Sequence, residues 1–375
     1  MQELQQRRSP FKGRDLAILS LGEFSALGSG ARVLSDAQAR YLLQFSLLAP
    51  SSHNTVPQAY CLGAGDTCAI YLRREFVLEA SDPTGEEALI SVGCAVEAFA
   101  IAAAAYGVEC EWRPAPGLSW SGVRPGPAQA PVHMGTLFAR RSSTEAKDSV
   151  IERTLSALLA RQVVRAEYDR NLPLPGAVAS ALELATARSG VRLAMFHTSA
   201  QKFAWAKLDE MALKHKLEED PFRVELGRWL LPNDDVTSTR GMRGHEFGLD
   251  DRLALELSAQ LRGDAALESD QLALLARASR VGLVSSSALG VLSTRDDTPE
   301  SAVQVGRAFQ RAAVTIVEHG FSCAVHTAVC QVSHARSMAQ ATLMGGIRPK
   351  LIFRLGKPLN AENARRRNSC DSGTR

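Results

Sequence analysis

Two segments of the 375-residue chain share one layout, and this repeat limits the possible folds more than any other feature. Each segment is a helix-like run bracketed by glycines fourteen positions apart, Gly93–Gly107 and Gly306–Gly320. An acidic stretch with a proline precedes each run, as at many helix starts, and the closing glycine suits a left-handed helix cap. A strand-like segment follows each, at 108–112 and 321–325. The pattern predicts two copies of one helix–strand unit, and the alternative is coincidence between two ordinary units.

The first of these helices is apolar on nearly every face, from Gly93 to Tyr106. A helix without a polar face is typically buried all round. We therefore expect it to be a central helix packed on a sheet, or one partner in a dimer-like helix interface.

A polar stretch follows the helix-like run Ala39–Leu48 and reads Ala-Pro-Ser-Ser-His-Asn-Thr, residues 49–55. Pro50 cannot continue a helix and disfavours helical geometry at Ala49, so the chain must turn here. The turn presents hydroxyl, imidazole and amide groups together. Hydroxyls and amides both donate and accept hydrogen bonds, which suits the polyol and carbonyl edge of a cofactor. The alternative interpretation is an ordinary Ser- and Asn-rich connection between a helix and a strand.

This stretch resembles the Pro-Ser-(Ser/Ala)-His-Asn-Thr-Gln-Pro segment of the nitroreductase-like flavoproteins, which lines one side of bound FMN in that family. Val56 stands where the family has Gln, Pro57 agrees, and Gln58 replaces Trp. Residues 161–169, followed by Asn-Leu-Pro-Leu-Pro and the periodic run 176–187, resemble the opening of a second nitroreductase unit.

The resemblance implies an α+β fold of two tandem nitroreductase-like lobes that form a pseudo-dimer. Each lobe would be a small, mostly antiparallel sheet packed with helices. The implied boundaries are an N-terminal extension at 1–35, lobe one at 36–150, and lobe two with a C-terminal basic tail at 151–367.

The resemblance also implies a single FMN site whose parts are divided between the lobes. Lobe two reads Arg-Ser-Gly-Val-Arg-Leu after its first helix, without the polar stretch, which predicts one FMN per chain. Val163 departs from the Ser common between the family's two arginines. The alternatives are a solvated pair of arginines and a disordered basic tail. No catalytic residue is assigned. The implied cofactor-binding residues are Pro50, Ser51, Ser52 and Asn54 from lobe one, Arg161, Arg165, Thr327 and Ala328 from lobe two, and Arg365 and Arg366 from the tail.

The implied activity is that of an FMN-dependent oxidoreductase, which passes hydride from NAD(P)H through flavin N5 to an electron-poor small molecule. Because the cofactor carries the chemistry, the protein needs no nucleophile. No Gly-x-Gly-x-x-Gly fingerprint is present. Two alternatives stay open: an FMN-sequestering or storage protein with a lidded site, and a flavin-dependent biosynthetic oxidase. Since tandem lobes already imitate a dimer, we expect a monomer or a weak homodimer.

Composition limits the partners, metal sites and cellular locations that we expect. With 43 basic and 40 acidic residues, the net charge of +3 argues against nucleic acid or a membrane surface as partner. Seven cysteines without zinc-like spacing indicate no metal site and a reducing, cytoplasmic location. No apolar run of 18 residues is expected. Arg7–Lys12 resembles a twin-arginine export signal, but Asp15 and Glu23 interrupt the apolar part that should follow.

Overall fold

The computed structural model describes residues 16–28, 32–63, 66–126, 131–187, 190–233, 235, 238–267 and 269–359. The predictions for Arg7–Lys12, Arg365 and Arg366 lie outside these residues. By internal contacts the chain divides into two units: unit one is 1–161 with 296–318, and unit two is 162–295 with 319–375. The sequence boundaries at 35, 150 and 367 stay a prediction, because contact-based units need not follow repeats in the sequence.

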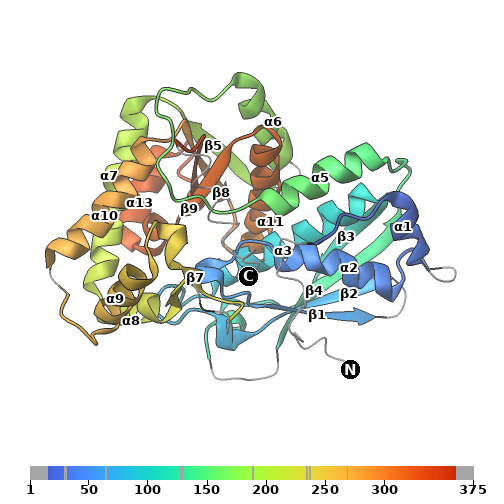
Figure 1. Ribbon diagram of the computed structural model, residues 1–375, viewed down its shortest axis with the longest axis horizontal. Helices are drawn as coiled ribbons and strands as arrows, with labels where there is room; N and C mark the ends of the chain where they lie inside the picture. The colour runs from blue at the N-terminus through green and yellow to red at the C-terminus, as the bar shows by residue number, and fades with distance from the viewer. Residues whose placement is uncertain are drawn as a thin grey trace, which may run out of the picture. The chain divides into compact units, whose positions relative to one another are not determined.

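Unit one contains a four-stranded antiparallel sheet in the order β1-β2-β4-β3, packed against helices (Figure 1). Its helix α2 starts with Ser35 in a capping box with Gln38, and α3 begins after Gly85 in the left-handed conformation. Its elements are α1 (Leu21–Ala26), α2 (Asp36–Leu47), η1 (Ser52–Asn54), β1 (Gln58–Gly63), β2 (Thr67–Leu72), η2 (Arg74–Phe76), α3 (Glu86–Ala105), β3 (Val108–Pro114), α4 (Trp120–Val123), β4 (Val132–Arg141), α5 (Asp148–Ala160) and α11 (Pro299–Glu318).

Unit two contains a second four-stranded antiparallel sheet, in the order β5-β8-β10-β9. A helical insertion, α7–α10, separates β5 from β8. The predicted α+β class, with small antiparallel sheets packed with helices, is confirmed. The elements are α6 (Gly176–Ala187), β5 (Arg192–Phe196), α7 (Ser199–Glu218), α8 (Asp220–Trp229), β6 (Leu230–Leu231), β7 (Met242–Arg243), η3 (Gly244–Phe247), α9 (Asp251–Arg262), α10 (Ser269–Val284), β8 (Ala288–Thr294), β9 (Ser322–His326), α12 (Ala328–Gln331), α13 (Ser333–Thr342) and β10 (Arg348–Gly356).

The two sheets match in more than strand order. In β4 the pairing with β2 skips Met134, and in β10 the pairing with β8 skips Lys350, so each sheet carries a bulge in its third strand. Cys110 and Cys323 each lie three residues after the closing glycine of the preceding helix, at corresponding places in β3 and β9. The same topology and irregularity therefore occur twice in the chain.

Helices α3 and α11, both in unit one, approach each other closely enough that only glycine fits at the crossing. A Cβ on Gly93 would lie 2.0 Å from the carbonyl oxygen of Val303, and a Cβ on Gly306 would lie 1.9 Å from that of Ile90. Each contact reaches the residue three positions before the other glycine, so the two contacts are reciprocal. Across the same pair of helices, buried Glu97 accepts hydrogen bonds from Arg307 and Arg311.

The prediction that the first glycine-bracketed helix is buried all round is confirmed, because in α3 only Glu87, Ile101 and Ala104 are not buried. The expectation of no long apolar run is wrong. Within the described residues, α3 alone is long and apolar enough to cross a membrane, yet 89% of its 18-residue window is buried inside the protein. It is the core helix of unit one.

Candidate functional site

The stretch after α2, residues 49–56, forms a strained connection that we call the polar turn. His53, Asn54 and Val56 have φ angles of 46°, 53° and 49°. Such left-handed conformations are costly for residues other than glycine, and for a β-branched residue such as Val56 they are outliers. Strain of about 1–3 kcal/mol per residue persists only where the surroundings enforce it, which is typical of functional sites.

Hydrogen bonds from α3 and from within the turn hold this conformation. The Ser52 hydroxyl donates to Oε2 of Glu87 at 2.5 Å, and the Ser52 amide donates to Oγ of Ser91 at 3.2 Å. Ser51 Oγ accepts from the amide of Val56 at 3.0 Å. The hydroxyl proton of Ser52 is therefore committed to Glu87, so toward a ligand this oxygen can only accept. The hydroxyl proton of Ser51 is not used in its bond to Val56.

A second carboxyl group, that of Asp82, lies just before α3 and close to Glu87. Asp82 is buried and accepts a hydrogen bond from the amide of Ala88 at 2.8 Å. Burial raises the pKa of Asp82 well above its usual value, and the nearby charge of Glu87 raises it further. A proton on Asp82 relieves repulsion with Glu87, the residue that holds Ser52.

Arg161, at the end of α5, belongs to unit one and lies beside the polar turn. Its Nη2 donates to the carbonyl oxygen of Leu48 at 2.5 Å, directly before the turn. The residue is 8% exposed, so it is not the solvated helix-end charge of the alternative interpretation. The structure thus brings Arg161 together with the predicted segment Pro50–Asn54.

Arg165 lies in unit two, where three side chains from one short segment surround its guanidinium group. Nη1 is 3.2 Å from Oε2 of Glu246, Nη2 is 3.9 Å from Sδ of Met242, and the Phe247 ring centre is 4.4 Å away. Burial lowers the pKa of Arg165, and the Glu246 carboxylate opposes this. Glu246 is 81 positions away from Arg165, so no local pattern in the sequence marks it as the partner.

Thr327 lies between β9 and α12 of unit two, and Ala328 is the first residue of α12. The carbonyl oxygen of Thr327 accepts from the amides of Cys330 and Gln331, and Ala328 packs in the apolar core of the unit. Their contact with a flavin stays a prediction, as does the phosphate role of Arg365 and Arg366.

A partly buried polar cluster in unit two carries no local sequence signal, because its members come from α7, α10 and β9. Asp209 Oδ2 accepts from the Ser279 hydroxyl at 2.6 Å and lies 3.3 Å from Nδ1 of His326. Ser279 Oγ is 3.1 Å from the same ring nitrogen. A serine-hydrolase relay needs both ring nitrogens of the histidine, one for the serine and one for the acid. The arrangement is therefore not a hydrolytic triad.

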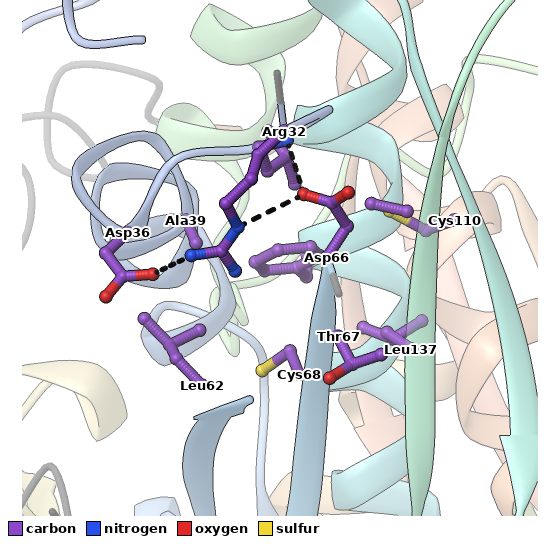
Figure 2. A pocket seen from close by; sticks show the side chains of 12 residues that line it. Arg32, Asp36, Ala39, Leu62, Asp66, Thr67, Cys68, Cys110 and Leu137 are labelled. Carbon is purple, nitrogen blue, oxygen red and sulfur yellow. Dashed lines mark hydrogen bonds and ion pairs between the residues drawn. The ribbon is translucent and has the colours of Figure 1, made fainter. Parts of the chain in front are cut away.

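A small hollow in unit one lies at the other end of α2 from the polar turn (Figure 2). Arg32 crosses its mouth, 2.8 Å from Asp36 and 3.6 Å from Asp66, and the empty volume including the opening is about 310 Å³. Burial raises the pKa of Cys68 and of Cys110 to about 12, so neither is a reactive thiol at neutral pH. With twelve residues in α2, roughly 18 Å separates the hollow from the turn.

No protein-family model and no curated protein matches the chain. Solved structures of nitroreductases do. An FMN-bound nitroreductase from Bacteroides fragilis NCTC 9343 is 14% identical over 55% of this chain and 89% of its own, with a TM-score of 0.32. The FMN- and NADPH-dependent nitroreductase NfnB from Sphigopyxis sp. strain HMH is 16% identical over 56% and 90%, with a TM-score of 0.35. The FMN-dependent NfnB from Mycobacterium smegmatis, in complex with NADPH, is 10% identical over 60% and 99%, with a TM-score of 0.36. Because the identities and TM-scores are this low, only the residues of this chain can support a function for it.

Proposed function

We propose that the protein is an FMN-dependent oxidoreductase that passes hydride from NAD(P)H to an electron-poor small molecule. The observation that supports this most is the polar turn. Its hydroxyl and amide groups are fixed in a strained conformation by Glu87 and Ser91, and a buried arginine, Arg161, lies directly beside it. Preorganised polar groups of this kind fit a ligand that combines a polyol with a carbonyl-rich ring.

The donor set fits FMN in kind. The phosphate requires cationic groups, which Arg161 and Arg165 can supply, and the ribityl chain requires hydroxyl and amide partners such as Ser51 and Asn54. Ser52 would accept a hydrogen bond, because its proton is held by Glu87. When bound, FMN supplies the hydride chemistry, and the residues of this chain bind it and fix its orientation.

We further propose that the chain is a single-chain pair of nitroreductase-like lobes with one FMN. The two sheets share strand order, direction and bulge. In the sequence, only the first is preceded by the polar stretch, because residues 188–193 read Arg-Ser-Gly-Val-Arg-Leu. This asymmetry supports one flavin per chain, and the tandem lobes support a monomer or a weak homodimer.

The visible spectrum of the purified protein, followed by identification and quantification of released flavin, tests the proposal. We expect about one FMN per chain and oxidation of NADPH that depends on a quinone or nitroaromatic acceptor. Two FMN per chain would contradict the asymmetric arrangement, and absence of FMN after incubation with it would contradict the cofactor. Bound FMN that NADPH and NADH fail to reduce would favour sequestration.

A further inference from the structure

A buried arginine of unit two, Arg354, is bonded to the backbone of a partly exposed one, Arg165. Among the described residues, one carboxylate contacts this pair directly. Arg354 is 2% exposed, and its Nη2 donates to the carbonyl oxygen of Arg165 at 2.8 Å. Its Nη1 donates to the carbonyl oxygens of Ala166 and Gly282, while its Nε has no hydrogen-bond partner among the described residues. Burial lowers the pKa of Arg354, and the like charge of Arg165 lowers it further.

The direct carboxylate contact comes from Glu246, which bridges two parts of unit two. One oxygen, Oε2, contacts Arg165 at 3.2 Å, and the other, Oε1, accepts from the amide of Arg243 at 3.0 Å. Phe247 adds its ring to the same guanidinium group. The segment Met242–Phe247 thus places an anion and an apolar cover on Arg165, the arrangement that a bound anionic ligand would otherwise provide.

We propose that Glu246 occupies the seat of a phosphate monoester at Arg165, and that ligand binding replaces this carboxylate and lifts the segment Met242–Phe247. This inference rests on the proposed function, in which the monoester is that of FMN. It identifies Glu246 as an internal competitor that sets the affinity for the phosphate group.

Charge explains why a phosphate monoester can displace this carboxylate. Glu246 brings one negative charge to the Arg165 guanidinium group, whereas a phosphate monoester brings nearly two, with three acceptor oxygens. An anion with a single negative charge would not displace Glu246, because it offers Arg165 no more charge than this carboxylate does. Oε1 of Glu246 accepts from the amide of Arg243 in the same segment, so a carboxylate that keeps this bond can leave Arg165 only if the segment moves with it.

The variant Glu246→Gln tests the seat, because glutamine removes the charge but keeps an oxygen acceptor for the amide of Arg243. We expect its affinity for FMN, measured by flavin fluorescence quenching, to rise about tenfold, as for loss of one half-buried ion pair. The affinity for riboflavin, which has no phosphate, should not change. Glu256→Gln, which removes the exposed partner of Arg252 in the same unit, is the matched control and should change neither affinity.

Combining the change with Arg165→Ala isolates the interaction. If Glu246 acts only through Arg165, then Glu246→Gln has no effect on FMN affinity in the Arg165→Ala background. Trypsin cleavage after Arg243 should also become faster when FMN is bound, because the segment is lifted. Equal FMN affinity of the parent protein and Glu246→Gln would overturn the inference, as would an equal gain for riboflavin.

Inorganic phosphate separates failure of this inference from failure of the proposed function. At constant ionic strength, phosphate should raise the Tm of Glu246→Gln by about 2 °C more than it raises that of the parent protein. If phosphate does this while no variant binds FMN, the seat is correct and the cofactor is wrong. If FMN binds and phosphate stabilises both proteins equally, the cofactor is correct and Glu246 is no competitor.

Discussion

The connections that lead into the two sheets differ far more than the sheets themselves. The connection between α2 and β1 consists of residues 48–57, which contain the polar turn. The connection between α6 and β5 consists of residues 188–191. After the first strand the difference reverses, because β1 and β2 form a hairpin while α7–α10 lie between β5 and β8. The comparison teaches that the scaffold is repeated and the candidate chemistry is not. The polar groups proposed to bind a ligand lie in one connection of unit one. Unit two instead carries the insertion α7–α10, whose Glu246 pairs with Arg165.

The largest expected effect is a loss of folding stability, caused by substitutions at the crossing of α3 and α11. Gly93→Ala and Gly306→Ala each place a Cβ about 2 Å from a carbonyl oxygen, so each should lower the free energy of unfolding by about 3–5 kcal/mol. Urea denaturation measures this. Gly176→Ala, where nothing lies within 4 Å, is the control and should be nearly neutral. A loss below about 1 kcal/mol for either crossing glycine would show that the helices are further apart than described.

A smaller effect, on FMN binding, tests the role of the polar turn. Glu87→Gln removes the charged acceptor of the Ser52 hydroxyl, and we expect FMN binding to weaken by about 1.5–3 kcal/mol. Ser52→Ala in the Glu87→Gln background should cost little more, because the pair acts together. Isothermal titration with FMN measures both. Additive losses would mean that Glu87 and Ser52 contribute separately.

The strain at Asn54 can be separated from its amide group. Asn54→Gly keeps the left-handed backbone accessible but removes the amide, whereas Asn54→Ala removes the amide and adds backbone strain. Both should weaken FMN binding by about 0.5–1.5 kcal/mol through loss of a neutral hydrogen bond. The alanine variant should in addition be less stable to unfolding than the glycine variant, by about 1 kcal/mol. Equal stabilities would argue against strain at this position.

The smallest effect concerns pH and Asp82. Since its pKa is raised in the folded state, folding binds a proton there, and stability falls as pH rises from the unfolded pKa through the folded one. Asp82→Asn should flatten this part of the curve of unfolding free energy against pH, while leaving an acceptor for the Ala88 amide. An unchanged slope in the variant would assign the pH dependence to another group.

Local patterns gave the repeated helices and strands, because caps and periodicity are local signals. Gly176–Ala187 matches α6, and the predicted strands at 108–112 and 321–325 match β3 and β9 within two residues. Strand β8 was missed because all seven of its residues are buried, so no polar alternation marks it. Strand β4 extends to Arg141, although the two arginines at its end are typical of a surface connection. The Ser52–Glu87 bond and the Arg165–Glu246 pair join residues 35 and 81 positions apart, a separation at which one sequence carries no signal.

The reciprocal glycine contact between α3 and α11 has a consequence for synthesis. Gly93 leaves the ribosome 213 residues before Gly306, so at 5–20 residues per second the most apolar helix of the chain waits roughly 10–40 s for its partner. Throughout that interval a segment long and apolar enough for a bilayer has no finished core to enter. Slower translation between the two helices lengthens the time in which the apolar surface of α3 is open to aggregation.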